Sequence, residues 1–566
     1  MLPTKMLMFV FVICIFLVQT NVLGQNKTIK LTNSQHLEQC NKEKDLILVN
    51  GKIITMNKDN EIATKIRIRN KRIVAIGNVD DFEGETFTDK CTTIIDLKGH
   101  TVIPGLIDSH LHFVRQGLAP GYDVREVESA TSIQQFLRFL KSADSTVPKN
   151  KVVMVLGGIS LDQLNEKRIP NLKEFDSAVS KRPLYVQLGF AGPVYTNSLG
   201  IKYFKKLGMS VDDNGVISKG KETAKAFAVL QSKQNLADQI RSTKSLMAYA
   251  NSMGLTMVFD EGGTGFPGAS YFFGRDEYKA LMNINSKHES TLRVKIQHTS
   301  TSKTLQRDIY DEKIENTFPF FGNDMLRYSG TGEHIVSFPI NGKVNSIYSD
   351  KIKATAALGW SHEQHSVSYD ENKQHLAMIA KINKKHGIKN LRWSLSHVFE
   401  LGMNGTEKLI SDLKTMKMGL RLQNHGYYAK TDVFPLGRTM GGENAGPLYR
   451  TLYDHGIPLS AGTDGSLLGP MNPWFSIYYM VTGKNNEGVL VNPNQYLTRL
   501  EALELYTRGS AWFGFDEKKL GSLEVGKLAD LVVLNKNYLT VDAEEIRTIK
   551  SVLTIVDGRI VYQDKL

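Results

Sequence analysis

Two histidines one residue apart, His110 and His112, end an apolar stretch that begins at Val102 and contains a Pro-Gly turn. Side chains at positions i and i+2 of a strand point to the same face, so the two imidazoles can aim at one point. Imidazole is the commonest side-chain ligand for metals, and two that converge at a strand end form half of a site for a divalent metal. Such a pair also occurs on protein surfaces without any functional role, so other parts of the sequence are needed to interpret it.

Three further candidates, His365, His397 and Asp464, each follow a later short apolar run. If those runs are neighbouring parallel strands, their carboxyl ends meet at one edge, and so do the side chains that follow them. Four histidines and one aspartate offer nitrogen and oxygen donors of the kind that zinc prefers.

The elements that must position these residues alternate between short apolar strands and helical stretches over residues 105–519. Eight strands are predicted, which is the count of an α/β fold of the (β/α)8 TIM-barrel type. Residues from about 115 to 240 are extra and are interpreted as an insertion after the first barrel strand. After the opening strand at residues 102–111, the expected strands are Met257–Asp260, Leu292–Ile296, Leu326–Tyr328, Ala357–Gly359, Leu391–Leu395, Met418–Leu422 and Ile457–Ala461.

Both ends of the chain have a β pattern, over residues 45–104 and 520–566. Asn50-Gly51 lies between two apolar runs and predicts a hairpin, and so does Asp557-Gly558. Each end is too small to bury a core alone, so we expect both to pack together into one small β-sandwich.

Composition and charge indicate which classes of partner and which location the protein has. The 566 residues carry a formal charge of +12 that is spread along the chain, which disfavours a nucleic-acid partner. Residues 1–24 have a basic start and a short apolar run, which is typical of a secretory signal peptide and too short to anchor in a membrane. We therefore expect an exported protein, periplasmic or extracellular. Cys40 and Cys91 then remain, and their spacing leaves open whether they pair.

Several stretches together resemble the amidohydrolase superfamily of metal-dependent hydrolases. More narrowly, the chain resembles the amidohydrolase-3 or YtcJ-type branch, relatives of N-substituted formamide deformylase, over nearly its whole length. The stretches that carry the resemblance are VIPGLIDSHLHF (102–113), YTNSL (195–199), LSHVFE (395–400), IPLSAGTD (457–464), EALELYTRGSAW (501–512) and GSLEVGKLADLVVLN (521–535).

The resemblance implies an enzyme that hydrolyses C–N bonds other than peptide bonds, in an amide or formamide-like small molecule. It implies one or two zinc ions, or another divalent metal, and Asp464 as both ligand and proton shuttle. His365 rather than His362 matches the branch. The implied metal ligands are His110, His112, His365, His397 and Asp464.

One position departs from the family pattern. Many two-metal members carry a bridging lysine on the fourth barrel strand, and here that position falls near Gly332. Glu333 could replace the lysine, because a carboxylate can also bridge metals. The alternatives are a site with one metal, or a different alignment of this strand.

Other residues are candidates for substrate contact or packing. His425 follows the seventh strand, and Trp360 could line an apolar pocket, although such residues are commonly buried in the core. His298 and His334 have no counterpart in the family and are interpreted as surface or supporting residues. Deamination of a heterocycle at the same site, and a non-catalytic binding protein with a decayed metal site, are the alternative functions. Association into a homo-oligomer stays open.

Overall fold

The computed structural model describes residues 44–78, 91–263, 277–337, 339, 342–398, 406–428, 446–465 and 469–566. The predicted signal peptide and Cys40 lie outside these residues. Cys91 is disulfide-bonded. Across the described part of the chain, no helix combines the length and the apolar character needed to cross a bilayer.

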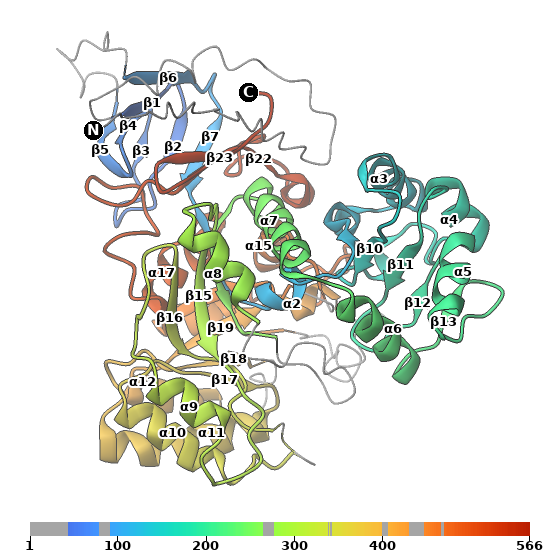
Figure 1. Cartoon of the computed structure of the whole chain (residues 1–566). Coiled ribbons are helices and arrows are strands. Elements are labelled where there is room, and N and C mark those ends of the chain that lie inside the picture. Colours follow the sequence, from blue (N-terminus) through green and yellow to red (C-terminus); the bar gives the residue numbers. More distant parts are fainter. Residues whose placement is uncertain are drawn as a thin grey trace, which may run out of the picture.

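The centre of the molecule contains two four-stranded sheets in which every neighbouring pair of strands is parallel (Figure 1). Helices alternate with the strands, as the α/β prediction requires. The first sheet contains, in spatial order, β16 (Leu326–Thr331), β15 (Arg293–His298), β14 (Leu255–Asp260) and β8 (Leu106–Leu111). The second contains β17 (Glu363–Ser366), β18 (Ser394–His397), β19 (Gly419–Gln423) and β20 (Leu459–Gly462).

The helices between and after these strands bury one face each against them. The intervening helices are α7 (Leu236–Ser252), α8 (Lys279–Ser286), α9 (Ile309–Glu315), α10 (Tyr348–Ala357), α11 (Tyr369–His386), α12 (Thr406–Met416) and α14 (Tyr449–Asp454). After β20 come α15 (Pro473–Thr482), α16 (Arg499–Leu505) and α17 (Arg508–Phe513). A large hydrophobic cluster includes residues from both sheets and from all of these helices except α17. Ala511 and Phe513 of α17 belong to a smaller cluster with residues of β8 and β14.

The two central sheets touch each other at both edges. At one edge an isolated parallel bridge joins Thr331, at the end of β16, to His362, just before β17. At the other edge the backbone N–H of Asp464 donates to the carbonyl of His110 at 2.9 Å, and the Ser109 hydroxyl donates to the carbonyl of Ala461 at 2.9 Å. The ends of β8 and β20 are therefore held side by side.

Two further sheets lie together at one end of the molecule, and the larger of them combines strands from both ends of the chain (Figure 1). One hydrophobic cluster contains Ile53 and Ile66 from the first end together with Leu531 and Leu553 from the last. The six-stranded sheet runs β23 (Arg559–Gln563), β22 (Ser551–Val556), β21 (Leu531–Leu534), β7 (Thr101–Pro104), β2 (Lys52–Ile54) and β3 (Ile62–Ala63). The four-stranded sheet runs β5 (Arg72–Gly77), β4 (Lys65–Arg69), β1 (Asp45–Val49) and β6 (Thr92–Asp96).

The hairpin predicted around Asn50-Gly51 is wrong, because β1 and β2 belong to different sheets. Asn50 has φ +57°, so the pair does turn the chain, but the turn carries it from one sheet to the other. A side chain at Gly51 would meet Leu97, since an added Cβ would lie 2.4 Å from its Cδ1. The second predicted hairpin is confirmed: β22 and β23 pair antiparallel across Asp557-Gly558.

The strand predicted at Ala357–Gly359 is also wrong. Ala357 is the last residue of α10, and the strand begins later, at Glu363. Gly359, with φ +74°, allows the chain to leave the helix, and the backbone N–H of Trp360 bonds back to the carbonyl of Thr355. A short apolar run does not distinguish a helix end from a strand.

The predicted insertion has its own sheet and its own hydrophobic cluster, and it stands to one side of the central strands (Figure 1). Phe136, Val155 and Phe175 lie within that cluster. The sheet order is β13 (Val216–Ile217), β12 (Val194–Tyr195), β11 (Leu184–Gln187), β10 (Val153–Leu156) and β9 (Tyr122–Asp123). The α-helices are α3 (Ile133–Thr146), α4 (Leu172–Ala178), α5 (Ser198–Lys206) and α6 (Lys221–Ser232).

Candidate metal centre

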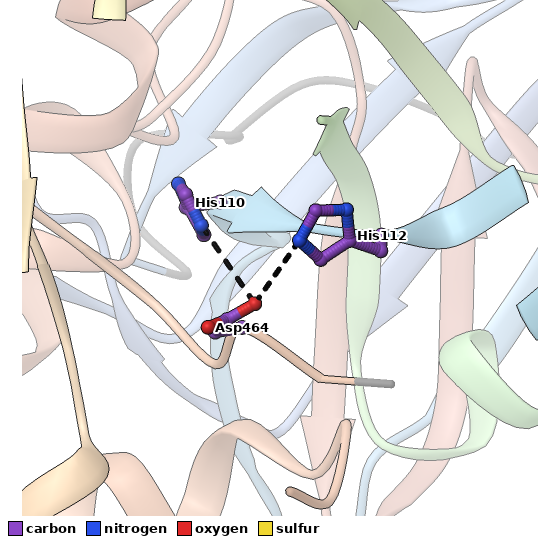
Figure 2. Close-up of side chains that lie close together, drawn as sticks. All are labelled: His110, His112 and Asp464. Carbon is purple, nitrogen blue, oxygen red and sulfur yellow. Dashed lines mark ion pairs between the residues drawn. The ribbon is translucent and has the colours of Figure 1, made fainter. Parts of the chain in front are cut away.

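His110, His112 and Asp464 converge where β8 and β20 end (Figure 2). The Oδ1 atom of Asp464 lies 3.4 Å from Nε2 of His112 and 3.7 Å from Nε2 of His110. Both histidines are buried, and the Asp464 side chain is 12% exposed. The spacing of one residue between the histidines therefore does aim both rings at one carboxylate.

Asp108 holds these two strand ends together. Its carboxylate accepts the backbone N–H of His110 at 3.0 Å, and it accepts the hydroxyl of Thr463 at 2.6 Å. Gly462 passes so close to His110 that an added Cβ would lie 2.7 Å from the backbone of that histidine. Burial raises the pKa of Asp108 to about 7, although Thr463 and the His110 N–H oppose the shift. Gly462 and Asp108 thus set the spacing of the His110, His112 and Asp464 side chains.

The carboxylate of Glu333 lies among the histidines, just beyond the end of β16. Its Oε2 atom lies 2.9 Å from Nδ1 of His365 and 3.1 Å from Nε2 of His397. Its Oε1 atom lies 3.2 Å from Nε2 of His112. The backbone N–H of Glu333 donates to Glu261 at 2.9 Å, which fixes the start of this loop. One carboxylate thus contacts histidines from three different strand ends.

His425, the first residue of a 3₁₀ turn after β19, contacts the other oxygen of Asp464, with Nε2 3.1 Å from Oδ2. Burial alone would raise the pKa of Asp464. The hydrogen bond with His425 and the nearby His110 and His112 outweigh burial and hold that pKa well below its usual range. Asp464 is therefore ionised.

His334 joins the site, although the sequence suggested only a surface or supporting residue. Its Nε2 atom lies 3.4 Å from Oε1 of Glu333, and its ring centroid is 4.6 Å from that of His365. Its position next to Glu333 in the sequence is the signal that could have indicated this.

His362 and His298 are engaged elsewhere. His362 binds the hydroxyl of Thr331 through Nδ1 at 2.7 Å and the hydroxyl of Tyr348 through Nε2 at 3.1 Å. His298 stacks on Tyr328, with ring centroids 4.4 Å apart. Both of these imidazoles serve packing and hydrogen bonding, which agrees with the choice of His365 over His362.

Trp360 is fully buried in the main hydrophobic cluster. Its indole N–H donates to the carbonyl of Ile314 at 3.2 Å, and its ring meets that of His298 edge to face. These contacts favour the packing interpretation of Trp360 over a place in a substrate pocket.

Two further residues next to the site, Glu363 and Arg421, were not predicted from the sequence. Oε1 of Glu363 lies 2.6 Å from Nδ1 of His110, and Oε2 of Glu363 lies 2.6 Å from Nη1 of Arg421. Glu363 could have been noticed, because it precedes His365 by two residues on one strand and thus shares its face. Arg421 gives no comparable signal.

The arrangement has the chemistry of a centre for divalent metal ions. Ligand atoms within 4.8 Å of one another occur in the groups His110–His112–Asp464, His110–Glu333–His397, Glu333–His334–His365 and His397–His425–Asp464. Imidazole nitrogens with carboxylate oxygens are the donor set of catalytic zinc sites. Each of these groups could hold a divalent metal ion.

Comparison with known proteins agrees with this interpretation. A family model described as "Amidohydrolase family" matches residues 93–562. N-substituted formamide deformylase of Arthrobacter pascens is 22% identical over 558 residues, covering 92% of this chain and 98% of that protein. YtcJ of Bacillus subtilis, which carries an amidohydrolase name, is 23% identical over 547 residues, covering 91% and 98%.

A similar fold occurs in the crystal structure of an uncharacterized metal-dependent hydrolase from Pyrococcus furiosus. The TM-score is 0.57 at 19% sequence identity, and the match covers 88% of this chain and 100% of that one. The resemblance inferred from the sequence motifs is confirmed.

Proposed function

The chain belongs to the amidohydrolase family, and from this premise we propose that it hydrolyses a non-peptide C–N bond in an amide or formamide-like small molecule. The observation that carries the proposal is the convergence of His110, His112 and Asp464 on one side of Glu333, with His365 and His397 on the other. Of the relatives, the formamide deformylase suggests the type of bond.

We propose that zinc occupies this centre, because its donors are imidazole nitrogens and carboxylate oxygens. When bound, a divalent metal supplies the Lewis acidity that lowers the pKa of water from ~15.7 towards about 7 and polarises a carbonyl oxygen. His110, His112 and Asp464 would hold one ion, and His365 and His397 a second. Glu333 would bridge the two, in place of the lysine that many relatives carry.

Asp464 is proposed as the group that moves the proton. It accepts a proton from the attacking water as the water oxygen bonds to the carbonyl carbon, and it returns that proton to the departing nitrogen. The C–N bond breaks, and an acid and an amine are the products. His425 would hold the carboxylate of Asp464 through the 3.1 Å contact while the proton is transferred, and it is also placed to meet a substrate.

The architecture proposed for this activity is a closed (β/α)8 barrel with a small β-sandwich beside it. The Thr331–His362 bridge and the bond from the Asp464 N–H to the His110 carbonyl support closure of the two central sheets. The hydrophobic cluster that combines residues 48–102 with residues 523–555 supports the sandwich. In such a barrel the site lies at the carboxyl ends of the strands, where the βα loops select the substrate.

Export of the protein stays a proposal that rests on the pattern of residues 1–24. Amino-terminal sequencing of the protein secreted by its source tests it. A first residue near Gln25 is the expected result, and a mature chain that retains residues 1–24 would contradict export by this route.

Metal analysis and a substrate screen together test the proposed function. We expect about one or two equivalents of zinc in the purified protein and loss of both metal and activity in His110→Ala. The zinc-loaded enzyme is then screened against formamides, N-acyl amines, ureas and cyclic amides. Absence of bound metal would contradict the hydrolase, and bound metal without turnover of any of these compounds would favour a binding protein.

A further inference from the structure

Three buried side chains, those of His110, Glu363 and Arg421, form a line between the central strands. Nδ1 of His110 lies 2.6 Å from Oε1 of Glu363, and Oε2 of Glu363 lies 2.6 Å from Nη1 of Arg421. The three side chains come from β8, β17 and β19, and none is more than 1% exposed. The line therefore connects strands that are distant in the sequence, out of reach of solvent.

Arg421 is fixed from several sides. Its guanidinium lies over the rings of Phe259 and Phe513, 4.9 and 5.1 Å from their centroids. Its Nη1 atom also lies 3.4 Å from the carbonyl of Ser109, one residue before His110. Because the planar guanidinium is confined in this way, it presents Nη1 to Glu363 in one orientation.

The buried charges of Glu363 and Arg421 stabilise each other. A buried carboxylate without a partner is costly, and here the single cation of Arg421 lies beside Glu363 and 3.9 Å from Glu261. His110, Glu261 and Glu363 are close enough together to hold a metal ion. A guanidinium next to both carboxylates disfavours a second cation there, so Glu363 serves as a partner of His110.

The contact with Glu363 determines which ring nitrogen of His110 faces the candidate metal site. An imidazole binds a metal through a nitrogen without a proton, and the other nitrogen then carries the hydrogen. Glu363 accepts that hydrogen from Nδ1, which leaves the lone pair of Nε2 facing Glu333 and Asp464. His112 instead meets a neutral acceptor, the carbonyl of Gly262, at 2.9 Å. Of these two histidines, His110 is the one with a carboxylate at Nδ1.

We propose that Arg421 and Glu363 are positioning residues that set the orientation and the tautomer of the His110 ring, and through them the metal affinity of the centre. The inference rests on the metal site of the proposed function, but not on the identity of the substrate. Arg421 acts through Glu363, and Glu363 acts through His110.

The first test measures zinc affinity without any substrate, by competition with a chromogenic chelator. Glu363→Gln keeps the shape but removes the charge, and we expect the zinc dissociation constant to rise about 10- to 100-fold. The control is Glu517→Gln, since Glu517 also pairs with an arginine, Arg392, at 2.7 and 2.9 Å, although its side chain is 35% exposed. The Glu517–Arg392 pair lies before the amino end of β18, whereas the candidate metal site lies at the carboxyl ends of the strands. The zinc affinity of Glu517→Gln should therefore equal that of the wild type. Unchanged affinity in Glu363→Gln would overturn the proposal.

The second test reports on the imidazole itself. In metal-free protein, ¹⁵N NMR of the histidine rings should show a hydrogen on Nδ1 of His110, and Glu363→Gln should shift this Nδ1 signal while Glu517→Gln leaves it unchanged. Because no metal is needed, this result distinguishes failure of the positioning role of Glu363 and Arg421 from failure of the proposed function. An Nε2–H tautomer of His110 in the wild type would overturn the proposal.

Arg421→Lys provides an independent variant if Glu363→Gln does not fold. It retains a cation but loses the planar fork that reaches Glu363. We expect zinc affinity about threefold to tenfold weaker than in the wild type, with the tautomer of His110 less uniform. An affinity and a ring spectrum equal to those of the wild type would overturn the role of Arg421.

Discussion

Oε2 of Glu333 lies 2.9 Å from Nδ1 of His365, which joins the end of β16 to the end of β17. The same oxygen lies 3.1 Å from Nε2 of His397, and the other oxygen lies 3.2 Å from Nε2 of His112. Both oxygens of one carboxylate thus lie close to imidazoles that come from three strand ends. Two metal ions held by those imidazoles would share this carboxylate.

Replacement of Glu333 by glutamine tests the bridge through metal content. A neutral amide cannot offset the charge of two cations, so we expect a fall from about two zinc equivalents to about one after dialysis. Metal analysis of the purified variant measures this. Glu315→Gln, which removes an exposed carboxylate paired with Arg307, is the control and should leave the metal content unchanged. Equal zinc content in Glu333→Gln and the wild type would exclude a bridging role.

Asp464→Asn should separate metal binding from proton transfer. Asparagine retains an oxygen near His110 and His112 but cannot accept the proton of the attacking water, so we expect metal to remain and kcat to fall about 10²- to 10⁴-fold. Steady-state kinetics with metal analysis on the same sample checks both parts. The control is Asp454→Asn, an exposed carboxylate paired with Arg450. A fully active Asp464→Asn would show that another group moves the proton.

The positions of the candidate metal ligands could be predicted because they depend on local pattern. Short apolar runs indicate strands, and the polar residue that follows each run marks its carboxyl end. This located β14, β15, β19 and β20 closely and brought His110, His112 and Asp464 to the same place. Glu333 was noticed only because a lysine expected near Gly332 is absent.

Features that depend on which strands are neighbours could not be predicted in this way. Asn50-Gly51 indicates a turn, but local sequence does not say that β1 then pairs with β4 and β6 while β2 pairs with β3 and β7. The contact of Glu363 with His110 spans 253 residues. Arg421 reaches Glu363 across the interior, and an arginine in an apolar strand resembles a surface residue until its partners are known.

His425→Ala tests whether His425 acts through Asp464 or on the substrate alone. Loss of the 3.1 Å contact leaves the Asp464 carboxylate without the group that orients its Oδ2, so we expect kcat to fall about tenfold or more while KM changes little. Separate kcat and KM values decide between the roles. His455→Ala, at an exposed histidine bonded to the carbonyl of Thr451, is the control. A raised KM with unchanged kcat would assign His425 to substrate binding only.

Glu128 connects the insertion to the segment that follows Asp464. It lies in a 3₁₀ turn after β9, and its Oε1 atom accepts the hydroxyl of Tyr249 at 2.6 Å. Its Oε2 atom accepts the backbone N–H of Met471, seven residues beyond Asp464, at 3.0 Å. Burial raises the pKa of Glu128 to about 7, although the nearby Arg125 and the bond with Tyr249 oppose the shift.

This pKa gives stability a defined dependence on pH. The folded state binds the Glu128 proton more tightly than the unfolded state, whose carboxyl has a pKa near 4.5. The stabilisation is therefore complete below pH 4.5 and is lost as pH rises through 7, by about 3 kcal/mol in total. Glu128→Gln cannot titrate, so its free energy of unfolding relative to the wild type should increase by that amount between pH 4.5 and 8 in urea titrations. A constant difference for Glu128→Gln would contradict the raised pKa.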